Sequence, residues 1–111
     1  MAERFGSILV EPAKLRDYCL SDTHPRGRHK ARVFRSRLGF TAADSDMLRQ
    51  ALLDAAAHRQ DDLLPILADE FGRRYVLDFE LTTATGSATV RSAWIVLAGE
   101  DVLRLTSCYV L

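Results

Sequence analysis

The spacing of apolar residues changes once along this chain, and that change constrains the fold more than any other feature of the sequence. Up to about residue 58, apolar residues recur every three or four positions, as in helices that bury one stripe. After Gln60-Asp61-Asp62 the period shortens to two, as in strands that bury one face. The sequence therefore predicts an α+β fold, with two or three N-terminal helices packed on a C-terminal antiparallel meander of three to four strands.

Three helices are predicted in the first half. A short helix follows Glu11-Pro12 and runs to Leu20, because proline suits a first turn. A second helix is predicted from about Gly27 to Leu38, ended by Gly39, which suits a left-handed cap. A third begins at Thr41 to Asp44, where a capping Thr is followed three residues on by an acid, and it continues to about His58.

The second helix places two side chains beside the expected core. Its predicted apolar stripe is Ala31, Val33, Phe34 and Leu38. One helical turn before Val33 and Phe34 stand His29 and Lys30, which should extend the N-terminal end of that stripe.

Four strands are predicted in the second half, and short turns between them favour antiparallel neighbours. They are Leu64 to Glu70, Arg73 to Thr82, Ala88 to Leu97 and Val102 to Val110. In the last strand, strict alternation gives one face to Leu103, Leu105, Ser107, Tyr109 and Leu111. If the leucines face the core, Ser107 and Tyr109 lie on the helix-covered side.

Size and composition are those of an ordinary globular protein. The chain has 111 residues, 48% hydrophobic and 27% charged, which predicts a single domain spanning residues 1–111 with one core. Cys19 and Cys108 lie far apart, and the segment Met1 to Val10 lacks the apolar run of an export signal. We therefore expect a reducing cytoplasmic location and, without an apolar stretch of roughly 20 residues, no membrane association.

Charge is unevenly distributed although the net charge is zero. The stretch from Pro25 to Arg37 has no acid and six cations, namely Arg26, Arg28, Lys30, Arg32, Arg35 and Arg37. The stretch from Thr41 to Glu70 reverses this balance, with Asp44, Asp46, Asp54, Asp61, Asp62, Asp69 and Glu70 against Arg49 and Arg59. Such asymmetry creates local fields, and the basic stretch is suited to attract phosphates.

Several strong signatures of common enzyme classes are absent. The chain lacks a Gly-rich phosphate loop, His-Glu-x-x-His, Cys-x-x-Cys and Gly-x-Ser-x-Gly, so we expect no metal and no cofactor. The remaining candidate is Pro25 to Phe34, where an imidazole could transfer a proton and neighbouring cations could bind phosphate. The alternative is structural, with Lys30 extending to solvent and His29 bonded to a backbone carbonyl.

The sequence resembles a bacterial domain family of undefined function along nearly its whole length. The resemblance rests on Lys14 to Tyr18, His24-Pro25, Gly27 to Ala31, Phe34, Leu38 to Phe40, Gly72 to Tyr75, Trp94 and Arg104 to Tyr109. The resemblance implies the contexts of that family, whose members look like small stand-alone proteins and also occur as terminal modules of phage head-morphogenesis and polymorphic-toxin proteins. The family's last strand commonly has Pro, Thr and Pro where this chain has Leu103, Ser107 and Val110.

Helices followed by a four-stranded meander are similar to the metal-free ribonucleases that include barnase, EndoU, the tRNA-cutting colicins and RelE. This resemblance implies that His29 is the acid/base and that Ser107 and Tyr109 are positioning hydroxyls. It implies phosphate binding by Lys30 and Arg28, and the neighbouring cations Arg26 and Arg32 extend the same surface. Arg104 is the last-ranked candidate, because it lies on the other row of the last strand and reaches phosphate only if that strand twists or bulges at its end. Because a fold does not confer a function, two hypotheses remain. One is a metal-free endoribonuclease acting on RNA. The other is a non-catalytic module that binds a neighbouring protein of a toxin or phage system through its basic helix or its acidic third helix.

Overall fold

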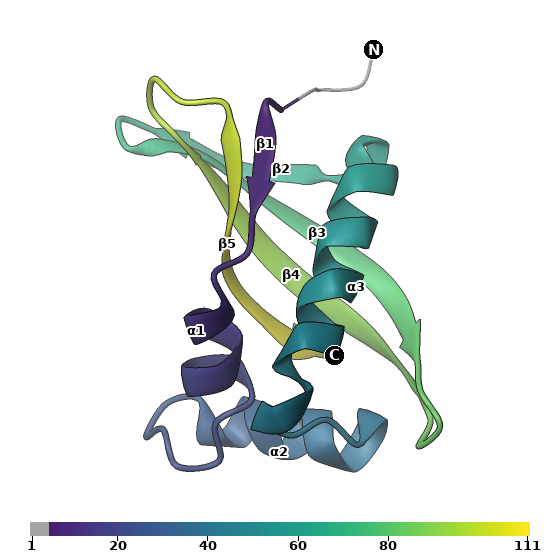
Figure 1. Ribbon diagram of the computed structural model, residues 1–111. Helices are drawn as coiled ribbons and strands as arrows, with labels where there is room; N and C mark the ends of the chain where they lie inside the picture. The colour runs from purple at the N-terminus through teal and green to yellow at the C-terminus, as the bar shows by residue number, and fades with distance from the viewer. Residues whose placement is uncertain (1–4) are drawn as a thin grey trace.

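The computed structural model describes residues 5–111 and has the expected two-part α+β arrangement, with helices in the N-terminal half and most of the sheet in the C-terminal half (Figure 1). Met1 to Arg4, which belong to the segment considered above for an export signal, lie outside the described residues. The helical elements are α1 (Pro12–Lys14), the π-helical turn η1 (Leu15–Cys19), α2 (Arg28–Leu38), η2 (Ala42–Asp44), α3 (Ser45–His58) and η3 (Gln60–Asp62). The strands are β1 (Ser7–Leu9), β2 (Leu64–Asp69), β3 (Gly72–Thr82), β4 (Ser87–Leu97) and β5 (Val102–Val110).

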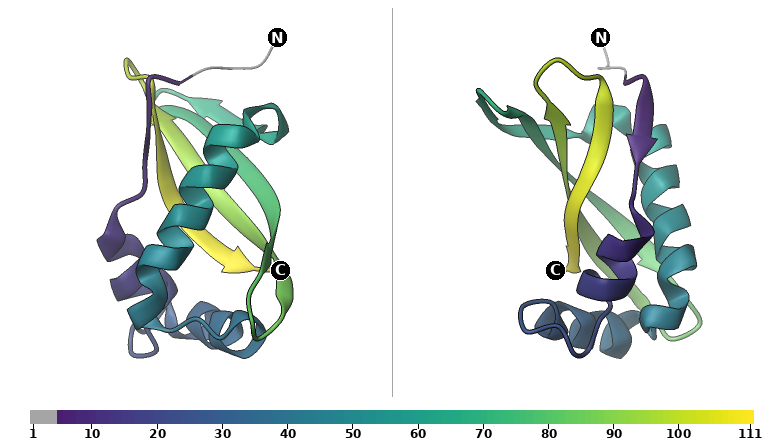
Figure 2. Two further views of the ribbon diagram at one scale, coloured as in Figure 1. Left: turned by 45° about the vertical axis from the view of Figure 1, so that its right-hand side comes forward. Right: turned by 60° about the vertical axis from the view of Figure 1, so that its left-hand side comes forward.

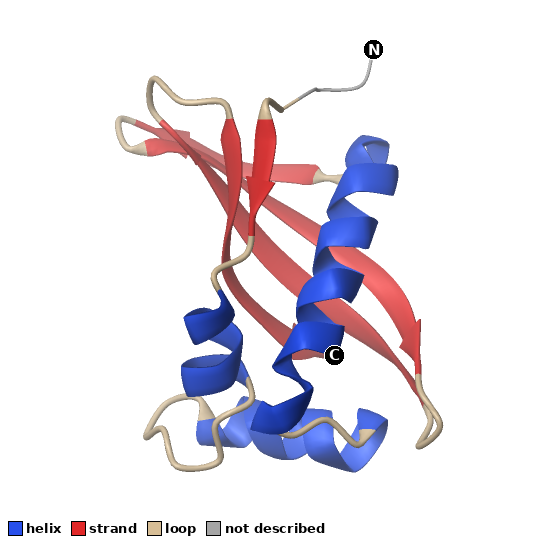
Figure 3. Ribbon diagram, in the orientation of Figure 1, coloured by secondary structure: helices blue, strands red, loops and turns tan. Residues whose placement is uncertain are grey.

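The five strands form one sheet in the order β1-β5-β4-β3-β2. Strands β2 to β5 make the predicted antiparallel meander, and β1 lies beside β5 in a parallel pairing (Figure 3). Strand β1 was not predicted, because three residues are too few to show a hydrophobic period. It pairs with β5 only from Val102 to Arg104, so the rest of that edge of β5 has no strand neighbour among the described residues.

The helices cover one face and one end of the sheet. Helix α3 runs across one face, and α2 lies across the end of the sheet where β5 finishes (Figure 2). The core between them includes Phe34, Leu38, Leu48, Leu52, Leu77, Val90, Trp94 and Leu103, all nearly inaccessible to solvent. Among the described residues, no helix is long and apolar enough to cross a membrane.

The helix ends agree with the local signals in the sequence. The Asp44 carboxylate accepts a hydrogen bond from the Thr41 backbone N–H at 2.8 Å, which caps the segment that becomes α3. Helix α2 ends at Gly39, whose φ of 73° is left-handed. On the same helix, Ala31, Phe34 and Leu38 are buried as predicted, whereas Val33 is 37% exposed. The stripe is therefore narrower than expected.

The predicted faces of the last strand are wrong beyond Leu105. Trp94 pairs with Leu105 but Ala93 pairs with Ser107, so Thr106 is an extra residue in a β-bulge. An extra residue shifts the alternation by one, and the buried row continues through Cys108 and Val110. Ser107 and Tyr109 therefore do not belong to the helix-covered row.

A buried serine links the central strands. The Ser92 side chain is fully buried; its hydroxyl donates to the Leu77 carbonyl at 2.7 Å and accepts from Trp94 Nε1 at 2.8 Å. These bonds satisfy both polar groups inside the core. The first bond ties β4 to β3, and the second fixes the Trp94 indole within β4, the strand that pairs with β5.

Candidate functional site

The start of helix α2 is held against the preceding π-helical turn. The His24 Nδ1 atom accepts hydrogen bonds from the backbone N–H groups of Arg26 and Gly27, both at 3.0 Å, and so satisfies donors at the helix start. A Cβ atom on Gly27 would overlap the Tyr18 carbonyl oxygen. Glycine thus permits the backbones of α2 and η1 to approach closely.

This close approach brings Tyr18 and Lys30 together. The Tyr18 ring lies edge-on to His24, with 4.7 Å between ring centroids, and Lys30 Nζ is 5.2 Å from the Tyr18 centroid. Tyr18 lies on the π-helical turn η1, and such turns are frequent at functional sites. The turn supplies an aromatic wall to the site.

Lys30 is the centre of the site. Its ammonium donates a hydrogen bond to Ser107 Oγ at 3.2 Å and lies 5.4 Å from the ring centroid of Tyr109. Two aromatic faces attract the cation by about 0.5–1 kcal/mol each where solvent has access. Since an ammonium has three N–H donors and the described residues accept from one, Lys30 keeps donors for a bound ligand.

The Lys30 ammonium and the Ser107 hydroxyl line an open pocket of about 440 Å³. Its other lining residues are Ala13, Lys14, Asp17, Tyr18 and Thr106. Below, "Lys30 pocket" means this cavity. Two lysines and one aspartate give it a net positive lining, which suits an anionic group.

Ser107 reaches Lys30 because β5 has an open edge. The bulge turns Ser107 out of the helix-covered row, but beyond Arg104 no described strand covers the outer edge of β5. Both η1 and α2 pack against β5 there, so Lys30 approaches the strand at its edge. The predicted meeting of Lys30 with a hydroxyl of the last strand thus occurs, although the predicted face was wrong.

Tyr109 contributes its ring rather than its hydroxyl. It does not line the pocket, and its hydroxyl is hydrogen-bonded to Arg91, the residue opposite it on β4. Arg91 also binds Asp78 through two hydrogen bonds of 2.8 Å, which raises the pKa of Arg91 and lowers that of Asp78. This network orients the Tyr109 ring against the Lys30 ammonium.

The remaining predicted site residues lie outside the pocket. His29 is exposed, and its ring forms no hydrogen bond or ion pair with the residues that the structure describes. It lies one helical turn before the exposed Val33, whereas Lys30 lies one turn before the buried Phe34. Arg104 binds Glu100 at 3.2 Å. The three predicted phosphate-binding arginines of the basic stretch are exposed, namely Arg26, Arg28 and Arg32.

Sequence reasoning missed the pocket residues Lys14, Asp17, Tyr18 and Thr106. The first three belong to the predicted first helix, but Asp17 and Tyr18 lie on its π-helical turn, and no signal in the sequence predicts that turn. Thr106 was assigned to a regular strand instead of a bulge. The sequence pointed to these positions only through the family resemblance, which rests in part on Lys14 to Tyr18 and Arg104 to Tyr109.

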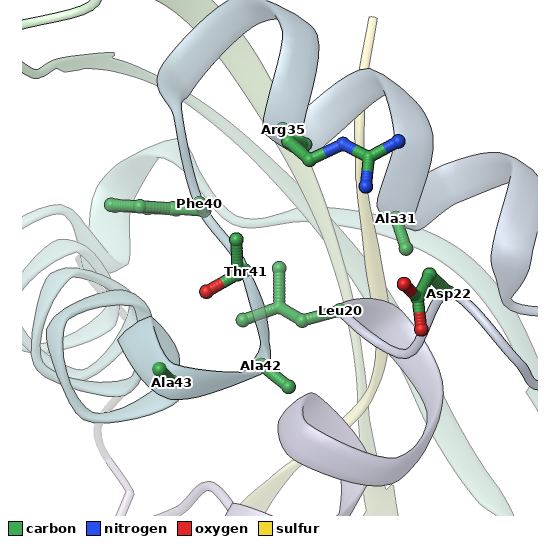
Figure 4. A pocket seen from close by; sticks show the side chains of 8 residues that line it. All are labelled: Leu20, Asp22, Ala31, Arg35, Phe40, Thr41, Ala42 and Ala43. Atoms are coloured by element: carbon green, nitrogen blue, oxygen red, sulfur yellow. The ribbon is translucent and has the colours of Figure 1, made fainter.

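A second, smaller pocket of about 200 Å³ lies between α2 and η2 (Figure 4). Its lining is largely apolar and includes Leu20, Ala31 and Phe40, with Arg35 and Asp22 as its charged residues. Because these two charges are opposite, this pocket is less suited to an anion than the Lys30 pocket.

Fold and site together define a small α+β domain that holds a lysine at the open edge of its last strand. The chain belongs to a family described as a domain of unknown function, DUF6883, which matches residues 2–111. Comparisons with curated proteins and with solved structures found no match. The predicted membership in a domain family of undefined function is therefore confirmed, while the phage and toxin contexts and the ribonuclease similarity stay predictions.

Proposed function

We propose that this domain binds RNA through a backbone phosphate in the Lys30 pocket and cleaves it without a metal ion. The observation that carries the proposal is the convergence of the Lys30 ammonium and the Ser107 hydroxyl in an open, positively lined pocket. An ammonium and a hydroxyl supply the charge and the hydrogen bond that a phosphate accepts.

The surroundings of the pocket support RNA as the ligand. The basic stretch continues along α2 with exposed cations that can follow a charged backbone. Tyr18 lines the pocket and offers an aromatic surface on which an unpaired base can stack. A single-stranded segment fits this combination better than a duplex, whose bases are already stacked.

The proposed chemistry is attack of a ribose 2′-oxygen on the adjacent phosphorus. A base removes the 2′-hydroxyl proton, an acid protonates the departing 5′-oxygen, and Lys30 stabilises the charge that develops on the phosphate. Ser107 orients the phosphate by a hydrogen bond. His29 is the proposed proton carrier, and because it lies on the exposed side of α2, the RNA has to pass over the first turn of that helix.

The test measures binding and cleavage of single-stranded RNA separately, with EDTA present throughout. Lys30→Met should weaken binding at least tenfold and abolish cleavage, whereas Arg59→Met, which removes an exposed cation beside Asp62, should change neither. His29→Ala should keep binding and lose cleavage. If Lys30→Met binds RNA as tightly as the wild-type protein does, the proposed site is refuted. If the wild-type protein binds RNA but cleaves none of a broad RNA panel, the catalytic step is refuted.

An exposed edge strand favours a second candidate function, the non-catalytic binding of a protein partner. Strand β2 is an outer strand of the sheet, and its side chains Leu64, Ile66 and Leu67 are 63%, 58% and 53% exposed. Apolar edge strands pair readily with an extended segment of another chain. The occupant proposed here is an apolar strand from the product of a neighbouring gene.

This candidate is tested by mixing the domain with the product of the adjacent gene. Leu67→Lys should break the complex, while Met47→Lys, which puts the same charge at a 61% exposed apolar site on α3, should not. Charge reversal at Asp44 is unsuitable as a probe of α3, since its carboxylate caps the helix start. Equal binding by both lysine variants would exclude strand addition at β2.

A further inference from the structure

Two thiols meet in the core below the Lys30 pocket. Cys19 is the last residue of η1, and Cys108 lies on β5 between Ser107 and Tyr109. Both are free thiols with 0% exposure, and both belong to the same buried cluster, in which η1 packs against β5. Residues from opposite ends of the chain thus bring two oxidisable sulfur atoms together.

The two thiols differ in acidity because they share a hydrogen bond. The Cys108 S–H donates to the Cys19 sulfur, which lowers the pKa of Cys19 and raises that of Cys108. Burial opposes ionisation of Cys19, whereas the positive charge of Lys30 and a hydrogen bond from Ser107 favour it. Cys19 is therefore the better nucleophile of the pair, since the thiolate is the reactive form.

The pocket provides the approach to these sulfurs. Tyr18 and Ser107 line it, and each is the chain neighbour of one of the cysteines. The Ser107 hydroxyl contacts both the Lys30 ammonium and the Cys19 thiol. Chain neighbours of both cysteines thus line an open cavity, and a molecule as small as hydrogen peroxide can reach the pair when those side chains move.

We propose that Cys19 and Cys108 are an oxidisable dithiol site, which a small hydroperoxide converts to a disulfide joining η1 to β5 beneath the Lys30 pocket. This inference goes beyond the proposed function and does not depend on it. Its products are measured on the protein alone.

The reaction has two balanced steps. The Cys19 thiolate attacks one peroxide oxygen, the O–O bond breaks, and the departing hydroxide takes a proton to become water, leaving a sulfenic acid on Cys19. The Cys108 sulfur then attacks the Cys19 sulfur, the S–O bond breaks, and the hydroxyl leaves as water with the Cys108 proton. Two thiols and one hydrogen peroxide yield one disulfide and two waters, the peroxide accepting two electrons.

The experiment oxidises the folded wild-type protein with equimolar hydrogen peroxide, alkylates the remaining thiols in denaturant and maps the peptides by mass spectrometry without reduction. We expect loss of both thiols, an intramolecular link between the Cys19 and Cys108 peptides, and recovery of both thiols with dithiothreitol. The proposal would be overturned if the folded protein kept both thiols free under a peroxide treatment that oxidises the denatured protein. It would also be overturned if the only disulfides formed were those of linked dimers.

Two single variants test the order of events. Cys108→Ser should stop at a sulfenic acid on Cys19, which dimedone traps. Cys19→Ser should slow the oxidation of Cys108 at least tenfold, because burial still raises the pKa of the remaining thiol and covers it from solvent. Rapid labelling of Cys108 in Cys19→Ser would contradict the assignment of Cys19 as the nucleophile. RNA cleavage has no part in these readouts, so a failure here is distinguishable from a failure of the proposed function.

Discussion

Ser92→Ala should destabilise the protein far more than the loss of one hydroxyl from the surface would. The substitution removes the acceptor of the Trp94 indole N–H and the hydroxyl donor to the Leu77 carbonyl, both in a site without solvent. A buried donor left without an acceptor costs about 1–3 kcal/mol. The indole ring fills the surrounding core, so water cannot readily replace the lost oxygen.

We expect a loss of about 2 kcal/mol in the free energy of unfolding. With an unfolding entropy near 2.1 cal/mol/K per residue, this loss lowers the melting temperature of a chain of this length by about 9 °C. Urea unfolding followed by far-ultraviolet circular dichroism, which does not depend on Trp94, measures the free energy, and calorimetry measures the temperature. Ser36→Ala, at an exposed position of α2, is the matched control and should stay within about 0.5 kcal/mol of wild type.

A double-mutant cycle with Trp94→Phe tests the physical reason. Phenylalanine has no N–H, so Ser92→Ala in that background leaves no indole donor without an acceptor. The loss of unfolding free energy caused by Ser92→Ala should therefore fall by about 1 kcal/mol. Additive effects, or a single-variant cost below about 0.5 kcal/mol, would refute the argument that the unsatisfied indole sets the penalty.

Three further predictions address the site and its support. Gly27→Ala should lower the free energy of unfolding by about 1–3 kcal/mol and weaken RNA binding, because the new methyl group overlaps the Tyr18 carbonyl. Urea unfolding measures the stability and RNA titration measures the binding; a variant as stable as wild type would contradict the close approach of the two backbones. Asp78→Asn should destabilise by less than about 1 kcal/mol at pH 7, since the Arg91 pair is partly exposed. Arg91 lowers the pKa of Asp78 in the folded protein, so the stability difference between wild type and Asp78→Asn is fully present above the unfolded pKa near 3.9. It is lost as the pH falls through the lower folded pKa, and it should vanish in unfolding curves at about pH 2. Lys30→Met should reduce the slope of log affinity against log salt by about 0.7 for single-stranded RNA, and an unchanged slope would show that Lys30 contacts no phosphate.

Much of the site's framework follows from local signals. Gly39 and the Thr41–Asp44 pair end one helix and begin the next, because their conformations and hydrogen bonds involve only near neighbours. The predicted bounds of β5, Val102 to Val110, are those observed. The helical period also places His29 in line with Val33 and Lys30 in line with Phe34. Only the burial of Phe34 and the exposure of Val33 show that Lys30 is the residue that enters the site.

The site itself depends on contacts that no local pattern contains. Lys30 and Ser107 are 77 positions apart, and their hydrogen bond requires α2 to lie across the end of the sheet. The bulge at Thr106 reverses the expected direction of Ser107 and brings Cys108 into the core beside Cys19. The alternation of side chains between the two faces of a sheet is a local property of the strand, but the position of a bulge that shifts it depends on pairing with the neighbouring strand.

By itself, the sequence determined the fold class, the strands of the meander and the ends of two helices, because hydrophobic period and capping act over a few residues. Only the tertiary structure decided which side chains meet. It joined β1 to β5 only as far as Arg104, left the rest of that edge without a strand neighbour among the described residues, and packed η1 and α2 against β5. These arrangements are set by the packing of distant segments, and the Lys30 pocket and the cysteine pair arise from them.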